Sequence, residues 1–175
     1  MKKTTLRNMN WGIIITVILL MISVVPVAEQ SVRAQDGPSE RSIEGVWLVK
    51  TTPRNCTTGE PNPTAAFESL WTFYKDGTML VSLPNNTLVL HRTAAHGLWR
   101  RDHGWSDYSF KIVLFRRNLT TGLFAGKQEG SGTLVLSESG DEFTTDGHTI
   151  VYSVDGIPRT PNCSNSVGTR FKLEP

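Results

Sequence analysis

Residues 108–117 read YSFKIVLFRR and show the clearest two-residue alternation in the chain. Tyr108, Phe110, Ile112 and Leu114 fall on one side of an extended strand, and the residues between them fall on the other side. No stretch after residue 28 has a helical period. We therefore predict an all-β fold, a small antiparallel up-and-down β-barrel of about eight strands that follows an N-terminal signal helix.

Short apolar runs separated by turn residues extend over the rest of the barrel region. The expected strands are residues 45–49, 67–74, 78–83, 97–101, 108–117, 123–129, 132–136, 142–145, 149–154 and 167–173. Residues 51–64, rich in Thr, Pro, Asn and Gly, are expected to form a loop. The stretch from residue 84 to 96 either crosses the end of the barrel as a loop or contains a short strand.

The first 34 residues have the order of a secretory signal. A basic start precedes an apolar run from residue 11 to 28, and the small residues Val32 and Ala34 suit a cleavage site. We expect cleavage after Ala34, with a cut after Ala28 as the second possibility. The competing interpretation is an uncleaved anchor, because the apolar run is just long enough to span a hydrocarbon core of about 30 Å.

Cleavage defines the domain organisation: residues 1–34 as signal peptide, 35–43 as a flexible lead-in and 44–175 as the barrel domain. The chain has 18 Lys and Arg against 16 Asp and Glu; the signal holds four and one of these, which leaves 14 against 15. This balance argues against nucleic acid or an anionic membrane as partner. The pairs at residues 100–101 and 116–117 are interpreted as solvated strand edges.

The signal also predicts where the protein works. We expect a monomer that is secreted or held in the periplasm or cell envelope, with no membrane insertion after cleavage. Cys56 and Cys163 are the only cysteines, and in an oxidising compartment they predict one disulfide bond. The alternative is two unrelated thiols. No C-x-x-C pair suggests redox chemistry.

Two short motifs carry a resemblance to a known family. Gly45-Val46-Trp47 resembles the G-x-W of lipocalins and related calycin barrels, and Gly168-Thr169-Arg170-Phe171 resembles the other half of that pattern. The resemblance implies a lipocalin-like barrel in which Arg170 packs over Trp47 and helps to close one end. Gly45, Trp47 and Arg170 would then be structural residues.

A second resemblance covers most of residues 43–173. The blocks at 52–56, 73–78, 96–99 and 167–171 are similar to a group of exported, uncharacterised bacterial proteins of about this length. This resemblance implies export and brings no activity.

Polar residues offer little chemistry. Three histidines lie close together in the sequence, near Asp102 and Asp107: His91, His96 and His103. Their spacing across an expected loop and turn gives no tetrahedral geometry, so we expect no metal site.

The carboxylates that could pair for hydrolysis are Asp102, Asp107, Glu142 and Asp146, all in turn contexts. Ser131 lacks a nucleophile elbow. We predict no catalytic residue and no cofactor, and lean against an enzyme.

Aromatic residues carry the functional hypothesis. An eight-stranded barrel is either filled by side chains or holds one small ligand. We expect Trp71, Phe73, Tyr108 and Phe110 to line such a site, in an exported, non-enzymatic barrel that binds a small, partly apolar molecule. One alternative is a cell-surface interaction or structural module that uses the loops at 52–64 and 84–96. The other is an isomerase or cyclase acting inside the barrel.

Overall fold

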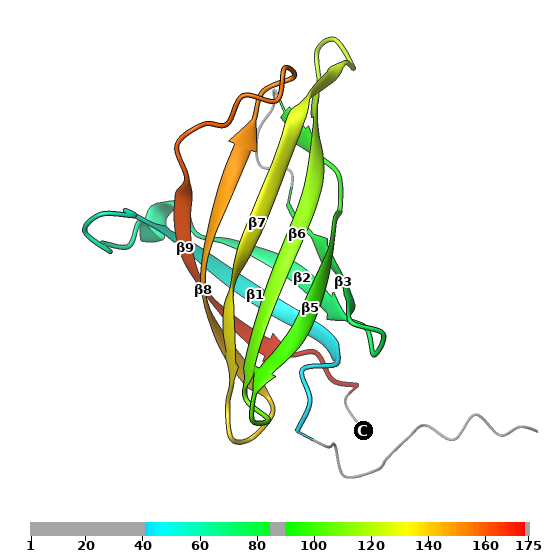
Figure 1. Cartoon of the computed structure of the whole chain (residues 1–175), viewed down its shortest axis with the longest axis vertical. Helices are drawn as coiled ribbons and strands as arrows, with labels where there is room; N and C mark the ends of the chain where they lie inside the picture. Colours follow the sequence, from blue (N-terminus) through cyan, green and yellow to red (C-terminus); the bar gives the residue numbers. More distant parts are fainter. Residues whose placement is uncertain (1–40, 85–89, 174–175) are drawn as a thin grey trace, which may run out of the picture. The chain divides into compact units, whose positions relative to one another are not determined.

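Eight strands wind around a closed ring in the computed structural model, which describes residues 41–84 and 90–173 (Figure 1). They are β1 (Gly45–Arg54), β2 (Phe67–Phe73), β3 (Thr78–Ser82), β5 (Ala95–His103), β6 (Asp107–Asn118), β7 (Phe124–Leu136), β8 (Glu142–Tyr152) and β9 (Asn162–Arg170). A short strand, β4 (Leu90–Arg92), and one 3-10 turn, η1 (Pro63–Ala65), complete the described elements.

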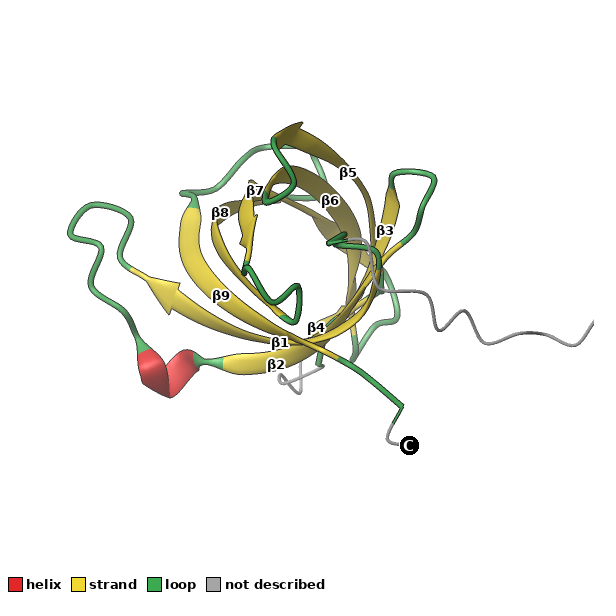
Figure 2. Ribbon diagram, turned by 90° about the horizontal axis from the view of Figure 1, so that it is seen from below, coloured by secondary structure: helices red, strands yellow, loops and turns green. Residues whose placement is uncertain are grey.

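The ring is antiparallel and joins neighbours in the sequence, as Figure 2 shows end-on. It closes where β9 pairs with β1, with Trp47 opposite Arg170. Strand β4 pairs with the last residues of β6, on the edge that β5 occupies further along. β4 and β5 therefore act as one interrupted strand, and the predicted all-β, up-and-down barrel of about eight strands is confirmed.

Two of the observed strands each join segments that the sequence pattern predicts as separate strands. Residues 123–129 and 132–136 form the single strand β7, and residues 142–145 and 149–154 contribute to the single strand β8. Glycines lie inside both strands, and Gly132 on β7 is opposite Gly147 on β8. A Cβ at Gly132 would lie 3.0 Å from the ring of Phe110 and 2.8 Å from the Cα of Gly147. The missing side chain at Gly132 therefore lets Phe110 and the backbone of β8 approach closely.

Several sequence-based expectations fall partly or wholly outside the described residues. The signal segment, residues 1–34, lies entirely outside them, as do residues 35–40 of the lead-in and 85–89 of the irregular stretch. Ile43, the last lead-in residue, is fully buried, and its carbonyl accepts a hydrogen bond of 2.8 Å from Nε1 of Trp47. Within the described residues, no helix is long and apolar enough to cross a bilayer.

Aromatic side chains pack one half of the barrel. We call the end that carries the start of β1 and the end of β9 the closed end, and the opposite end, where β6 leads into β7, the open end. At the closed end Phe143 packs against Trp47 at a centroid distance of 4.8 Å and against Phe73 at 6.1 Å. Trp99 lies 6.1 Å from Phe73 and 5.7 Å from Tyr108. Such ring pairs stabilise by about 0.5–1.5 kcal/mol each beyond the area they bury.

A disulfide bond joins Cys56 to Cys163 across 107 residues, so the sequence prediction is confirmed. Cys56 lies in the connection between β1 and β2, and Cys163 lies at the start of β9. The bond therefore ties the first strand to the last at the open end, opposite the contact between Trp47 and Arg170.

We predict that the double variant Cys56→Ser/Cys163→Ser is less stable by about 2–5 kcal/mol, because the bond restricts a long loop in the unfolded chain. Urea unfolding followed by tryptophan fluorescence measures the change. Dithiothreitol should lower the wild-type midpoint to that of the double variant and leave the variant unchanged. Equal stability of the oxidised and reduced wild type would contradict this expectation.

Candidate ligand-binding cavity

The open half of the barrel contains a cavity of about 300 Å³. Trp71 and Phe110 form its floor, with their ring centroids 5.2 Å apart. Trp71 also lies 5.9 Å from Phe143, so the floor rests directly on the packed rings of the closed end. The apolar wall consists of Phe67, Val81, Leu83, Ile112, Leu114 and Val151.

The cavity exists because short side chains occupy inward positions in this half. Thr51 lies opposite Ser166, and Ser166 lies opposite Thr145 in the next pair. All three are buried and line the cavity. Gly130 and Gly147 add inward positions with no side chain. Because an eight-stranded barrel is only just wide enough to be filled by side chains, this short row leaves space for a small molecule.

The polar atoms beside the floor are paired within the protein. The hydroxyls of Thr51 and Ser166 share a hydrogen bond of 3.0 Å. Nε1 of Trp71 donates to Oγ of Ser69 at 3.0 Å, and that hydroxyl donates to the carbonyl of Val49 at 3.4 Å. Buried polar groups that are already satisfied cost little to cover. The floor therefore suits an apolar group.

The mouth of the cavity is basic. Arg92 on β4 and Arg116 on β6 both line it and lie directly opposite each other in the strand register. Burial lowers the pKa of the Arg116 guanidinium, and the nearby cations of Arg92 and Arg159 lower this pKa further. The alternation that runs inward through Leu114 reaches Arg116 two residues later. The interpretation as a solvated strand edge fits exposed Arg117, whereas Arg116 is partly buried and lines the cavity.

The four aromatic residues predicted to line the site divide between the two halves. Trp71 and Phe110 line the cavity. Phe73 and Tyr108 are buried in the closed end, where the hydroxyl of Tyr108 donates to the carbonyl of Trp105 at 2.8 Å. The structure thus brings two of the four residues to the cavity. Their contact with a ligand stays a prediction.

The motif residues Gly45, Trp47 and Arg170 meet at the closed end. The guanidinium of Arg170 lies 4.3 Å from the centroid of the Trp47 ring. It donates to the carbonyls of Ser42 at 2.6 Å, Glu44 at 2.7 Å and Gly140 at 2.7 and 2.9 Å. Gly45 has a φ of 122°, and a Cβ there would lie 3.1 Å from Nη1 of Arg170. The stack covers the closed end, as the lipocalin resemblance implies.

The candidate histidines and carboxylates are not brought together. His96 and His103 are exposed near opposite ends of β5, and His91 lies on β4. Among the described residues, no three His, Cys, Asp or Glu side chains converge as metal ligands would. Asp102 bonds to Arg100 and Ser109, at 2.9 and 3.1 Å. The side chains of Asp107 and Glu142 do not reach the cavity.

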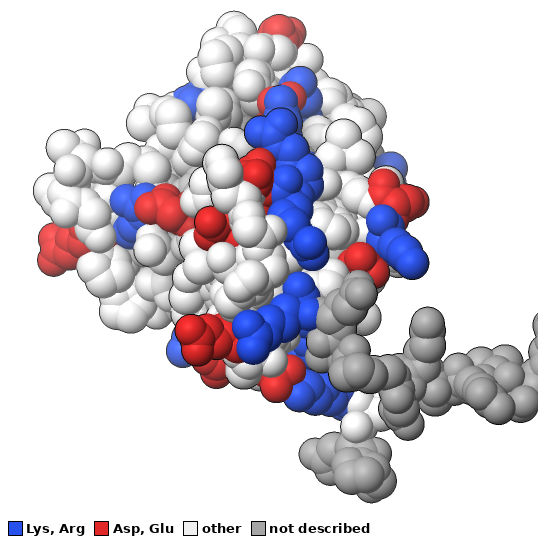
Figure 3. Space-filling model, turned by 60° about the horizontal axis from the view of Figure 1, so that its bottom comes forward, with Lys and Arg blue, Asp and Glu red and all other residues white. Residues whose placement is uncertain are grey.

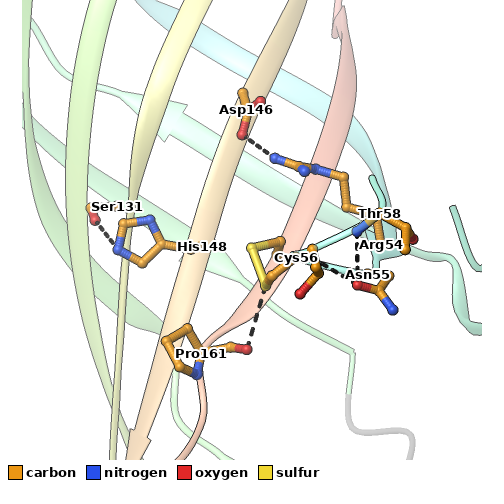
Figure 4. The surroundings of a disulfide bond; sticks show 10 residues. Arg54, Asn55, Cys56, Thr58, Ser131, Asp146, His148 and Pro161 are labelled. Atoms are coloured by element: carbon orange, nitrogen blue, oxygen red, sulfur yellow. Dashed lines mark hydrogen bonds and ion pairs between the residues drawn. A yellow bond between two sulfur atoms is a disulfide. The ribbon is translucent and has the colours of Figure 1, made fainter. Parts of the chain in front are cut away.

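Ser131 on β7 and His148 on β8 lie next to each other on neighbouring strands (Figure 4). Oγ of Ser131 lies 3.4 Å from Nε2 of His148. Strand alternation directs both side chains outward, and His148 is exposed. Asp146, two residues before His148, forms an ion pair of 2.6 Å with Arg54 (Figure 4). The carboxylate is thus engaged elsewhere, and the group lacks the orienting acid of a nucleophilic triad.

Comparison with known proteins adds no family to these observations. No protein-family model and no curated protein sequence matches the chain.

We predict that Arg170→Lys lowers the free energy of unfolding by about 2–4 kcal/mol, because a lysine keeps the charge but cannot reach all three carbonyls. Thermal and urea unfolding measure the loss. Lys172→Met is the matched control, since Lys172 pairs with the same neighbour, Asp141, at 2.8 Å but is exposed. The control should cost less than about 1 kcal/mol. Equal losses of stability in the two variants would show that the contacts of Arg170 with Trp47 and the three carbonyls do not stabilise the closed end of the barrel.

Proposed function

We propose that this protein is an exported, non-enzymatic, lipocalin-like barrel that binds one small, partly apolar molecule in the cavity of its open half. The observation that carries the proposal is the unequal filling of the interior. Packed aromatic rings occupy the closed half, whereas the open half holds a cavity of about 300 Å³ with a ring floor and an apolar wall. Small-molecule sites are concave, mostly apolar and supplied with a few polar groups.

The direct test is binding of N-phenylnaphthylamine, a neutral apolar dye whose fluorescence rises in apolar surroundings. We predict saturable binding with one site per chain, and a loss of about tenfold or more in affinity for Leu114→Trp, because the indole fills space that the dye needs. Phe115→Trp is the matched control, since Phe115 is the next residue on β6 and points outward. It should bind like the wild type.

Leu114 is buried, so Leu114→Trp can also damage folding. Val151→Trp, near the end of β8 on the cavity wall, blocks the same space with less repacking. Circular dichroism confirms that each variant is folded. The proposal fails if the wild type shows no saturable binding, or if both folded variants bind the dye as tightly as the wild type does.

Export is the second part of the proposal. It is supported by the signal-like order of residues 1–34 and by a disulfide, which persists in oxidising compartments. Mass spectrometry of the protein recovered from the periplasm or medium should give a chain that begins at Gln35. An intact chain beginning at Met1 in the membrane fraction would favour the uncleaved anchor.

A further inference from the structure

Like charges meet where the cavity opens. Arg92 and Arg116 face each other directly across two strands, an arrangement that destabilises a sheet. The main chain of Arg159 is held beside the end of β8 by a hydrogen bond of 2.8 Å to the carbonyl of Val151. No Asp or Glu is found among the described residues that line the cavity. The charged side chains among these lining residues are therefore all cations.

One of these arginines also has an unused donor. Nε of Arg116 is buried and has no hydrogen-bond acceptor within the described part of the chain. The pKa of Arg116 is lowered in the folded protein, so the charged guanidinium is less favourable there than in the unfolded chain. At neutral pH the group is protonated in both the folded and unfolded states, so the whole penalty is present. Partial burial of this charge beside other cations therefore opposes folding.

Arg170 at the closed end is a structural arginine and offers a comparison with Arg116. Arg170 donates to three carbonyls and lies 3.7 Å from the carboxylate of Asp141. Figure 3, which brings this end forward, shows Asp and Glu side chains beside Lys and Arg. In contrast, Nε of Arg116 has no acceptor in the described residues. The contacts of Arg116 therefore differ from those of the structural arginine at the closed end.

We infer that the mouth of the cavity is an oxyanion subsite, in which Arg116 and Arg92 bind the anionic head group of an amphiphile whose apolar body lies along β6. This inference rests on the proposed function and names the ligand class for it. A guanidinium presents paired donors that match the oxygens of a carboxylate or phosphate. Binding such a group would satisfy Nε of Arg116 and offset the repulsion between the two arginines.

The geometry of β6 sets the shape of this ligand. Phe110, Ile112, Leu114 and Arg116 form one inward row, which spans about 20 Å at the usual rise per residue. The row begins at the aromatic floor and ends at the cation. A cavity of about 300 Å³ along this row suits one single-chain molecule with its head group at the open end.

The test compares ligands that differ only in the head group. Calorimetry measures the affinity of the wild type for decanoate, decyl phosphate and decanol, each below its critical micelle concentration. We expect both anions to bind about ten- to a hundredfold more tightly than decanol, the range for a charge-assisted hydrogen bond. The ratio between decanoate and decyl phosphate shows which oxyanion the subsite prefers.

Two arginine variants locate the effect. Arg116→Met keeps an unbranched side chain and should lose the preference for anions while it retains the affinity for decanol. Arg117→Met, at the exposed neighbouring position of β6, should keep the wild-type preference. Equal losses in the two variants would indicate general surface charge and would overturn the inference.

Stability without ligand gives an independent measurement. Because Arg116 is a partly buried cation beside other cations, Arg116→Met should leave the melting temperature unchanged or raise it. A clear fall would indicate a structural role and overturn the inference. If the dye binds and neither decanoate nor decyl phosphate binds better than decanol, the inference fails and the proposed function stands. If the wild type shows no saturable binding of the dye, the proposed function fails and the inference fails with it.

Discussion

The interior width of an eight-stranded barrel is the constraint from which the rest of this structure follows. Each inward position either contributes to a filled core or leaves space, because the opposite wall is within side-chain reach. In the closed half the inward positions carry large rings, with Phe143 at the centre. In the open half they carry Thr51, Ser166 and Thr145 in one row. The cavity is the consequence of this division.

A barrel with one hollow half needs its seam held at both ends. The seam here is the pairing of β1 with β9. At the closed end Arg170 stacks on Trp47 and bonds to carbonyls on both sides of the seam, and at the open end the disulfide between Cys56 and Cys163 joins the same two strands. A cation–π contact stabilises by about 0.5–2 kcal/mol. Together these contacts let the hollow half keep its shape without a packed interior.

The sequence was sufficient for the architecture and for the ends of the seam. Alternation in residues 108–117 predicted the central strand, and the paired motifs around Trp47 and Arg170 predicted their contact. The same alternation extends to Arg116. The doublet with Arg117 concealed this, because adjacent arginines are typical of a solvated edge.

The cavity itself could not be predicted, because it depends on which short residues become neighbours. Thr51 and Ser166 are 115 residues apart in the chain, and only the strand register brings their hydroxyls together. The strand boundaries at residues 130–132 depend on neighbouring strands in the same way. Gly132 serves the close approach of Phe110 and Gly147 from neighbouring strands. For the same reason alternation alone placed Phe73 and Tyr108 with Trp71 and Phe110, although they lie in different halves.

A crystal structure of the barrel with N-phenylnaphthylamine tests the central claim most directly, since it shows both whether the open half is hollow and what occupies it. The account predicts electron density for the dye inside the barrel, resting on Trp71 and Phe110 and bounded by Leu114. Dye bound only on the outer surface, or an interior filled by side chains up to the mouth, would contradict it.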